Sequence, residues 1–473
     1  MKNTEENMIL SHFRHSQQSQ STFAELSGDF NPVHLDPVSA RRTMFGQVVT
    51  HGIHNVLCSL EIFLKKQPFS IDRLAVTFRN PIFLKEDVVI IPDNVTDISA
   101  ILKLQCGGID TTEIRMKGKP QKVKSSFCSL PVINFARQPE KKTFDELKNA
   151  KGSIKLTGNS KAIKSAFPQT VQALGIDGVA RLLSLTQLVG MRCPGLYSLF
   201  SSFDVTFSDQ RSNAPTQYRV THSDRRISLI SISVEGGGIT GTINAFVRPP
   251  PISQPNITTI KSHITGTPFK EMRALVVGGS RGLGEISAKI IAAGGGETTI
   301  TYLTGEDDAN HVAKDISKNG GRCKVLQMDV LEPASAIQSL MQRGWRPSHL
   351  LYFATPRISG RPDENNLDKF HGIYSGGLIN VIKALQKQSD KALTLFYPSS
   401  VYVVETPADM NNYAKAKIKG ETTAKNLAKD QPNLKVIIER LEPLATDQST
   451  SLLNVDLEAP LKTMVRLLTK RLC

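Results

Sequence analysis

Residues 23–34 read FAELSGDFNPVH and place a carboxylate and an imidazole, Asp29 and His34, five positions apart. Pro32 disfavours a helical conformation at Asn31, so we expect the pair on a bent loop. Such a bend can aim both side chains at one point, and reactions that move a proton from carbon and add or remove water need a base and an acid together. Asp29 and His34 are therefore candidate catalytic residues. The alternative is structural, because Asp-x-Asn-Pro is ordinary turn chemistry and His34 could lie on the surface.

A helix is expected downstream of this loop, over residues 52–63. Its apolar residues recur at the spacing of one helix face, at Ile53, Val56, Leu57 and Leu60. Gly52 begins the helix, and a backbone N–H at a helix N-terminus can donate to a thioester oxygen with help from the helix dipole. Gly52 is therefore a candidate oxyanion donor.

The stretch resembles the MaoC-like family of (R)-specific enoyl-thioester hydratases. The family signature is G-D-x-N-P-x-H, followed by a small residue, a phenylalanine, and H-G at the start of the helix. The chain matches each element, at Gly28, Asp29, Asn31, Pro32, His34, Ala40, Phe45, His51 and Gly52. The resemblance covers about residues 13–120. It implies a hotdog fold with Asp29 and His34 as the catalytic pair and Gly52 as the oxyanion donor.

A diverged repeat of this pattern is expected over residues 127–249, where a second helical run covers 179–189. Strand-like runs follow each helix, at 74–78, 88–91 and 100–104 in the first segment and at 203–207, 227–234 and 241–247 in the second. One helix followed by several strands, twice, is typical of a sheet wrapped around a helix. The second segment lacks the D-x-N-P-x-H motif, so we expect an internal pseudo-dimer whose second half completes the acyl and thioester-arm pocket. Whether Asp29 and His34 face a complete pocket stays open at this point.

A proline-rich stretch, with four prolines between Arg248 and Pro255, predicts a stiff extended linker. Beyond it, apolar strands alternate with amphipathic helices, which favours a doubly wound parallel sheet. The predicted fold is thus an α+β double hotdog followed by an α/β Rossmann sheet. The predicted domains are a first hotdog at 1–124, a degenerate second hotdog at 125–250, a linker at 251–267 and an α/β domain at 268–473.

Residues 277–284 read VGGSRGLG, directly after a strand and at the opening of a helix. Glycines in such a turn allow the backbone to approach closely, so that a pyrophosphate can sit on the helix N-terminus. A glycine pattern alone is weak support, and the rest of the domain strengthens it. The candidate cofactor-binding residues are Gly278, Ser280, Arg281, Gly282 and Gly284 in this turn, with Asp329 after a later strand and Lys417.

Tyr413 stands four positions before Lys417, which puts both side chains on one helix face. An ammonium near a phenol favours the phenolate, so the tyrosine can exchange a proton nearer neutrality. Ser400 lies thirteen positions before Tyr413, and this spacing after a glycine-rich turn resembles the short-chain dehydrogenase/reductases over about residues 270–450. The resemblance implies hydride transfer from a nicotinamide. Tyr413 would protonate the forming alkoxide, Lys417 would hold the nicotinamide ribose, and Ser400 would orient the carbonyl.

Two features favour NADPH over NAD as the cofactor. Arg281 precedes the second glycine, and no acidic residue immediately ends the strand TITYL at 299–303. The alternative for Arg281 is a solvated turn residue. The chain also departs from the family, since Phe353-Ala354-Thr355-Pro356 replaces Asn-Asn-Ala-Gly, and Tyr374 stands where a proton-relay asparagine is common. These departures leave the proton relay and the rate open.

Composition sets wider limits on function. Of the 473 residues, 40% are hydrophobic and 21% charged, the balance of a soluble globular protein. No apolar run approaches a membrane span, no secretory leader is visible, and six scattered cysteines predict reduced thiols in the cytoplasm with no metal site. The net charge of +15 fits either basic solvated faces or anionic partners such as nucleotides, coenzyme A or an acidic carrier protein. We find no nucleic-acid motif.

The two resemblances share an intermediate, because a ketoreductase makes the 3-hydroxyacyl thioester that a MaoC enzyme dehydrates. The same module types, in reverse order, resemble the peroxisomal multifunctional enzyme of β-oxidation. The primary hypothesis is NADPH-dependent reduction of a 3-oxoacyl thioester, carried by coenzyme A or acyl carrier protein, with reversible dehydration of the product. The alternatives are an NAD-dependent oxidative hydratase/dehydrogenase, a non-catalytic assembly component, or a hotdog half that only binds acyl groups. The length of the acyl chain and the choice between coenzyme A and carrier protein stay open. The oligomeric state is also open, and a homo-oligomer is one possibility.

Overall fold

The computed structural model describes residues 9–120, 130–209, 212–358, 364–449 and 457–473. These residues form two compact units, which meet in sequence between Pro250 and Pro251. The expected boundary between two hotdog halves, at residues 124 and 125, lies outside the described residues. Within the first unit we call residues 9–120 the first half and residues 130–250 the second half.

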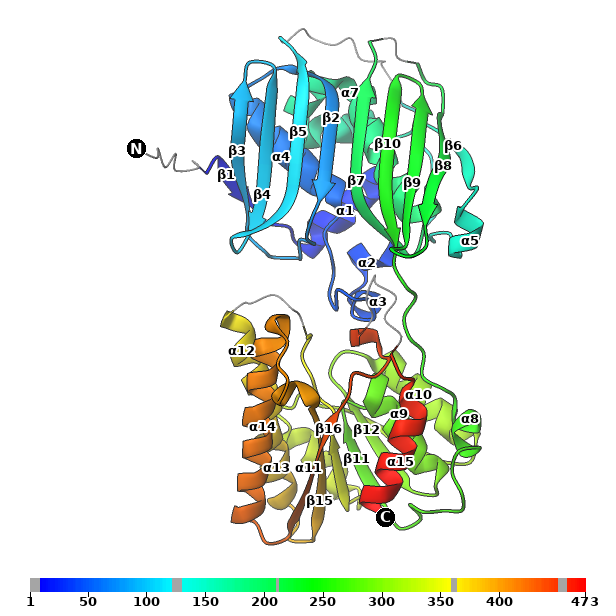
Figure 1. Ribbon diagram of the computed structural model, residues 1–473, viewed down its shortest axis with the longest axis vertical. Helices are drawn as coiled ribbons and strands as arrows, with labels where there is room; N and C mark the ends of the chain where they lie inside the picture. Colours follow the sequence, from blue (N-terminus) through cyan, green and yellow to red (C-terminus); the bar gives the residue numbers. More distant parts are fainter. Residues whose placement is uncertain (1–8, 121–129, 210–211, 359–363, 450–456) are drawn as a thin grey trace. The chain divides into compact units, whose positions relative to one another are not determined.

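The first unit contains one antiparallel sheet of ten strands in the order β1-β3-β4-β5-β2-β7-β10-β9-β8-β6 (Figure 1). The first half supplies β1 (Ser11–Phe13), β2 (Ser70–Phe78), β3 (Val88–Thr96), β4 (Ser99–Cys106) and β5 (Ile109–Lys119). The second half supplies β6 (Lys151–Ile154), β7 (Ser198–Phe207), β8 (Thr216–Asp224), β9 (Leu229–Gly236) and β10 (Ile239–Val247). The halves join where β2 pairs with β7, with Arg73 opposite Thr206 and Thr77 opposite Ser202.

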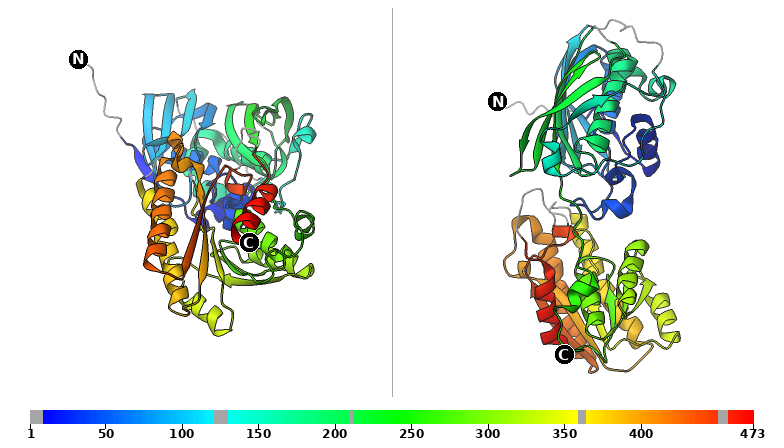
Figure 2. Two further views of the ribbon diagram at one scale, coloured as in Figure 1. Left: turned by 60° about the horizontal axis from the view of Figure 1, so that its bottom comes forward. Right: turned by 90° about the vertical axis from the view of Figure 1, so that its right-hand side faces the viewer.

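Two long helices, α4 (Gly52–Lys66) and α7 (Pro168–Gln187), lie side by side against one face of this sheet (Figures 1 and 2). Strand β4 shows that one face of the sheet is buried. Its side chains alternate between part-exposed and buried positions along its whole length. The buried side chains join those of α4 and α7 in one core. Burial of a leucine in such a core contributes about 1.5–3 kcal/mol.

Shorter helices complete the first unit around this core. They are α1 (Gln17–Ser27), α2 (Pro32–Leu35), α3 (Pro37–Ala40), α5 (Phe144–Leu147), α6 (Ser160–Ala166) and a π-helix, η1 (Leu188–Arg192). Helix α7 begins eleven residues earlier than the helical run expected from the sequence, and Gly175 interrupts it with φ 78° and ψ 161°. Because the helix is interrupted at Gly175, its apolar residues do not keep one helical spacing across the whole element. The hydrophobic pattern therefore predicts only the later part of the helix.

The second unit is built on a parallel sheet of six strands in the order β13-β12-β11-β14-β15-β16. The strands are β11 (Arg273–Val277), β12 (Glu297–Tyr302), β13 (Arg322–Gln327), β14 (His349–Tyr352), β15 (Leu393–Ser400) and β16 (Leu434–Leu441). Numbered from the first strand, this order is 3-2-1-4-5-6, that of a Rossmann sheet. The expected parallel sheet is confirmed.

Helices cover both faces of this parallel sheet (Figure 2). One face carries α8 (Ile257–Lys261), α9 (Gly282–Ala293), α10 (Glu306–Lys318) and α15 (Pro460–Leu472). The other carries α11 (Ala334–Gln342), α13 (Leu378–Gln386) and α14 (Asn411–Asp430), with α12 (Glu364–His371) and the π-helix η2 (Gly372–Gly377) beside α14. Each face of the sheet has its own cluster of buried side chains, as expected for a doubly wound sheet.

The expected extended linker at 251–267 contains a helix, α8, which differs from the prediction. Ile257 and Ile260 are fully buried and pack in the core of the second unit beside α9. Asn256 caps the helix by accepting a hydrogen bond from the Thr259 N–H at 2.9 Å. The proline-rich stretch ends at Pro255, before this helix begins. The burial of Ile257 and Ile260 stabilises the short helix that follows.

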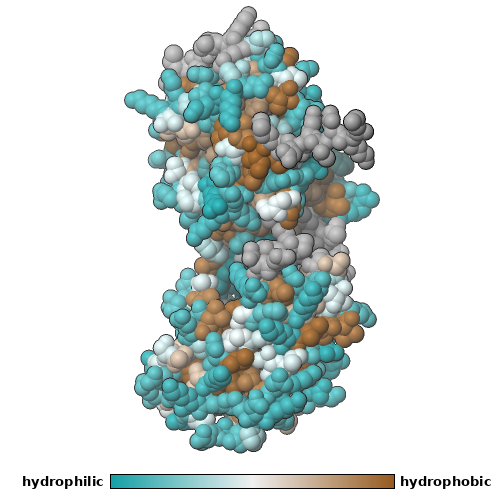
Figure 3. Space-filling view, turned by 90° about the vertical axis from the view of Figure 1, so that its left-hand side faces the viewer, coloured by the Kyte–Doolittle hydropathy of each residue, from teal (hydrophilic) through white to brown (hydrophobic). Residues whose placement is uncertain are grey.

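Polar side chains cover much of the face drawn in Figure 3, with apolar residues in patches between them. This is the usual surface of a folded domain. In the described parts of the chain, no helix is long and apolar enough to cross a membrane.

Candidate active sites

The loop after α1 is shaped by the residues of the G-D-x-N-P-x-H motif. Gly28 ends the helix with φ 75°, and a Cβ at this position would lie 2.5 Å from the ring of Phe135. Asn31 caps α2, accepting a hydrogen bond from the Val33 N–H at 3.2 Å, and Pro32 occupies the first turn. These three residues bend the chain between Asp29 and His34.

Asp29 is buried in this bend, with 1% of its surface exposed. Its Oδ2 accepts a hydrogen bond from the Thr186 hydroxyl at 2.6 Å, and its Oδ1 accepts one from the Asn31 N–H at 3.2 Å. Burial raises the pKa of Asp29, while the charge of His34 and the Thr186 hydrogen bond act in the opposite direction. The carboxyl is thus held in a defined orientation with a bias toward its protonated form.

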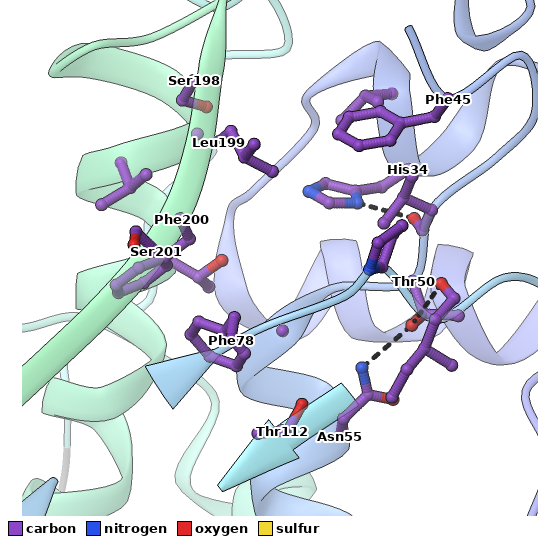
Figure 4. Close-up of a pocket in the computed structure, with 18 of the residues that line it drawn as sticks. His34, Phe45, Thr50, Asn55, Phe78, Thr112, Ser198, Leu199, Phe200 and Ser201 are labelled. Atoms are coloured by element: carbon purple, nitrogen blue, oxygen red, sulfur yellow. Dashed lines mark hydrogen bonds between the residues drawn. The ribbon is translucent and has the colours of Figure 1, made fainter. Parts of the chain in front are cut away.

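His34 follows on α2 with its Nδ1 2.7 Å from the Val49 carbonyl oxygen. A carbonyl only accepts, so Nδ1 carries the proton and Nε2 has the free lone pair when the ring is neutral. Burial lowers the pKa of His34, with the Asp29 charge opposing that shift. Figure 4 shows the ring extending into the pocket from one wall, with Leu199, Phe200 and Ser201 on the strand across it. A neutral His34 can therefore act as a base.

The pocket that holds this pair has a volume of about 190 Å³. The predicted residues Asp29, His34 and Gly52 all line it. Apolar side chains form much of its wall, among them Phe45, Phe78, Leu199 and Phe200 (Figure 4). The other apolar lining residues are Val33, Val49, Pro81, Ile82, Val189 and Phe246. Mostly apolar walls with a few convergent polar groups are typical of small-molecule sites.

The second half contributes directly to this pocket through Thr186 and Gly190, which the sequence analysis missed. A Cβ at Gly190, in η1, would overlap the carboxylate of Asp29. The Asn31 side chain also donates to the carbonyls of Gly190 at 2.9 Å and Gly195 at 3.1 Å. The open question of the sequence analysis is therefore answered, since Asp29 and His34 face a pocket that both halves line. The only signal was Gly190 itself, in the stretch LVGMRCPGLYS at 188–198, which resembles the turn after the hotdog helix but has no catalytic motif.

Gly52 begins α4. A Cβ at this position would lie 2.8 Å from the ring of Phe78, so the helix starts in close contact with that ring. His51 precedes it and is fixed by Gln20, whose Oε1 lies 2.9 Å from the His51 N–H and 2.7 Å from its Nδ1. The His51 Nε2 lies 3.0 Å from the Asp29 carbonyl oxygen. Gln20 and His51 thus connect the start of α4 to the loop that contains Asp29, and no local pattern predicts the Gln20 contact.

Two clusters among the described residues bring three metal-ligating atoms within 4.8 Å of one another. They are Asp29 with His34 and His51, and His15 with His54 and Cys58. In both clusters two imidazole rings are in contact: His34 stacks on His51 with centroids 4.0 Å apart, and His15 lies tilted against His54 at 4.1 Å. The His54 Nδ1 also accepts from the Gln20 amide at 3.0 Å. Hydrogen bonding and stacking account for these contacts, and we assign no metal to them.

In the second unit, the predicted glycine turn joins β11 to α9. Gly278 has φ 79° and lies so close to β14 that a Cβ would be 2.9 Å from the Phe353 carbonyl. A Cβ at Gly284 would overlap the Gly278 carbonyl, so α9 packs tightly on the turn. Around Gly282, by contrast, the nearest atoms lie 3.9 Å from a Cβ position. The first N–H groups of α9 have no side-chain cap, which suits a phosphate.

Arg281 forms an ion pair with Asp447 at 3.8 Å, a partner that the sequence analysis missed. Asp447 is buried and also accepts a hydrogen bond from the Ile252 N–H at 2.8 Å. Ser280 is buried in the same turn. Asp329 follows β13, and its Oδ1 accepts from the Leu331 N–H at 2.8 Å. These residues all follow the carboxyl ends of parallel strands, where ligands bind in such sheets.

Ser400, Tyr413 and Lys417 come together at the end of β15 and on the first turns of α14. The spacing from Lys417 predicted a lowered pKa for Tyr413, but burial raises this pKa to about 12, while a hydrogen bond with Ser400 acts in the opposite direction. The Lys417 Nζ donates to the Pro398 carbonyl at 2.8 Å. Burial lowers the pKa of Lys417 to about 7, opposed by Glu421. The structure thus assembles the three residues that the sequence singled out.

Comparison with known proteins bears on both units. Residues 4–98 match the family model described as the MaoC like domain. Similar solved structures include a short chain dehydrogenase from Burkholderia cenocepacia in complex with NADP, 22% identical, covering 42% of this chain and 89% of that one with a TM-score of 0.39. A short-chain dehydrogenase/reductase from Serratia marcescens is 18% identical and covers 43% of this chain and 91% of that one, with a TM-score of 0.38. Residues 4–98, which include Asp29, His34 and Gly52, therefore form a MaoC-like domain.

Proposed function

We propose that the chain is a bifunctional enzyme, an NADPH-dependent 3-oxoacyl-thioester reductase and an (R)-3-hydroxyacyl-thioester dehydratase. The observation that carries the proposal is the pairing of a buried Asp29 with a part-buried His34 in a mostly apolar pocket, both residues lying in the segment that matches the MaoC like domain. The group of Ser400, Tyr413 and Lys417, in the same unit as the glycine turn, supports the second activity. The 3-hydroxyacyl thioester is the product of the reduction and the substrate of the dehydration.

Dehydration needs a proton to leave carbon and another to reach the departing hydroxyl group. Burial favours the uncharged forms of Asp29 and His34, so the pair holds an acid and a base together. The His34 Nε2 takes the proton from the carbon next to the thioester carbonyl. Asp29 gives its proton to the hydroxyl group, which leaves as water, and the Gly52 N–H stabilises charge on the thioester oxygen. A proton passed from His34 back to Asp29 restores the pair.

We further propose that the first unit is a pair of hotdog halves, of which the second has lost its own catalytic motif. The repeated order of one long helix and its strands supports this, as does the pairing of β2 with β7. Thr186 and Gly190 give the second half a different role, because they hold the Asp29 carboxyl of the first half. On this view the degenerate half is retained to complete one site.

The second unit fits a nicotinamide dinucleotide. The open N-terminus of α9 and the turn at Gly278 to Gly284 would hold its phosphates, Arg281 the 2′-phosphate of NADPH, and Lys417 the ribose. When bound, this cofactor supplies the hydride. Tyr413 donates a proton to the oxygen of the reduced carbonyl, and Ser400 holds that oxygen. Burial raises the pKa of Tyr413, so at neutral pH the phenol carries the proton that this step uses.

The proposal is tested by following the loss of NADPH absorbance with acetoacetyl-CoA, with NADH in parallel and products identified by mass. We expect NADPH consumption with hydroxyacyl and enoyl products. Tyr413→Phe should abolish the consumption, and Asp29→Asn should leave only the hydroxyacyl product. Preference for NAD and oxidation would support the β-oxidation type of enzyme instead. No turnover with either coenzyme A or carrier-protein substrates would favour a non-catalytic component.

A further inference from the structure

We propose that Tyr374 is a positioning residue for Lys417, and that the face of its ring holds the lysine ammonium in place beside Tyr413. This inference rests on the proposed reductase activity. Tyr374 is 1% exposed and lies in η2, at the position where the related family often has an asparagine.

The geometry around Lys417 is that of an ammonium packed on aromatic rings. Its Nζ lies 4.2 Å from the ring centroid of Tyr374, against 5.3 Å for Tyr397 and 5.8 Å for Tyr413. Cations bind ring faces within about 6 Å, and the attraction grows when water is excluded. Lys417 is 7% exposed, and one of its three N–H groups is used by the Pro398 carbonyl. The Tyr374 ring is the nearest aromatic support for the charge.

The carboxylate of Glu421, one turn further along α14, does not replace this support. Its two oxygens accept hydrogen bonds from Arg440, each at 2.9 Å, and one also accepts from the Ser399 hydroxyl at 2.7 Å. Much of its charge is therefore balanced by Arg440. A lysine buried in this way needs other interactions to keep its proton, and ring faces supply them.

The Tyr374 ring is itself fixed from two sides. It stacks on Phe370 with centroids 5.8 Å apart and planes 5° from parallel. Its hydroxyl forms a hydrogen bond with the Thr355 hydroxyl at 2.6 Å. Thr355 belongs to the second departure from the family, so the two departures interact and form one structural unit. Thr355 holds Tyr374, and Tyr374 holds Lys417.

The sharpest test replaces Tyr374 with phenylalanine and then with mono-, di- and trifluorinated phenylalanine. Fluorine withdraws the negative charge of the ring face and barely changes its shape. The pKa of Lys417 is read from its Cε resonance in lysine-labelled protein, assigned by its loss in Lys417→Met. We expect the pKa to be similar in the wild type and Tyr374→Phe and to fall stepwise, by about one unit over the series. A flat series would overturn the inference.

Turnover gives a second measure. The ammonium form of Lys417 supports catalysis, so the reductase rate should fall as pH rises through the lysine pKa. Tyr374→Met fills the space without a ring face and should move this fall to lower pH, whereas Tyr374→Phe should not. Tyr352→Phe is the matched control, since Tyr352 is equally buried but bonds the Ile373 carbonyl. If the wild type consumes no NADPH, the proposed function fails while the titration still decides this inference. If the wild type is active and fluorination has no effect, only the inference fails.

Discussion

At the scale of single residues, the environment of Asp29 decides what the first site can do. A carboxyl beside a histidine is common on protein surfaces, where both groups titrate near their usual values. Here burial shifts the pKa of Asp29 upward and that of His34 downward. Both shifts favour the form with one transferable proton on the acid and a free lone pair on the base. The second half contributes the hydroxyl that tunes this balance.

Thr186→Val should raise the pKa of Asp29 further, because the lost hydroxyl donates to the ionised carboxylate. In the proposed mechanism the protonated Asp29 is active, so activity is present below its pKa and is lost as pH rises through it. The alkaline limb of the dehydratase pH profile should therefore move to higher pH in the variant. Thr186→Ser keeps the hydroxyl and should behave as the wild type. An alkaline limb that stays in place in Thr186→Val would contradict this account of Asp29.

Arg281→Ala should raise the KM for NADPH about tenfold or more and leave that for NADH nearly unchanged, since charge-assisted hydrogen bonds to a phosphate contribute about 1.5–3 kcal/mol. The ion pair with Asp447 keeps this guanidinium at the turn. Steady-state kinetics with both cofactors would measure the effect. Arg273→Ala is a suitable control, because Arg273 is an exposed arginine at the other end of β11. Equal losses with NADPH and NADH would argue against a contact with the 2′-phosphate.

At the scale of elements, two π-helices stand at the two sites. Helix η1 brings Gly190 against Asp29, and η2 brings Tyr374 under Lys417. A π-turn changes the direction of the side chains that follow it and is frequent at functional sites. Neither was predicted, because η1 covers 5 residues and η2 covers 6, and a change of hydrophobic period cannot be recognised over so short a run.

Gly190→Ala tests the role of η1. The added methyl group would overlap the Asp29 carboxyl, so the carboxyl or η1 must move. Overpacking of this kind lowers the free energy of unfolding by about 1–3 kcal/mol. We expect the activation free energy of dehydration to rise by more than this, because the acid itself is displaced. Thermal unfolding and enoyl hydration would be measured on the same protein. Gly372→Ala, where no atom lies within 4 Å of the Cβ position, is the control. Full dehydratase activity in Gly190→Ala would show that the contact is unimportant.

Elements with a strong pattern were predictable, and those shaped by tertiary contacts were not. The β11 strand, the glycine turn and the pairing of Tyr413 with Lys417 follow from local sequence, as does the loop with Asp29 and His34. Strand β5 was missed because its outer face is polar and charged. Its sequence IDTTEIRMKGK therefore contains no continuous run of apolar residues. The contacts of Asp29 with Thr186 and of Arg281 with Asp447 span more than 150 residues. Local sequence carries no information about such distant pairs.

At the scale of the whole molecule, the two proposed activities lie in separate compact units, each with its own core. Neither site borrows a described catalytic candidate from the other unit. A substitution in one site should therefore leave the chemistry of the other intact. The shared 3-hydroxyacyl thioester is then the chemical connection between the two units.

A mixture of two variant chains, each lacking one of the two activities, tests this independence. Asp29→Asn chains should reduce a 3-oxoacyl thioester and stop at the hydroxyacyl product, while Tyr413→Phe chains should dehydrate that product but not make it. Removal of an acid–base group costs about 10²–10⁴-fold in rate, so each block is nearly complete. Mixed together, the chains should form the enoyl thioester and consume NADPH, because the intermediate can diffuse from one to the other. A chain with both substitutions should do neither. If the mixture reduces the substrate but forms no enoyl product, while Tyr413→Phe alone dehydrates added 3-hydroxyacyl thioester, the intermediate is not released, and the two units must then act as one channelled enzyme.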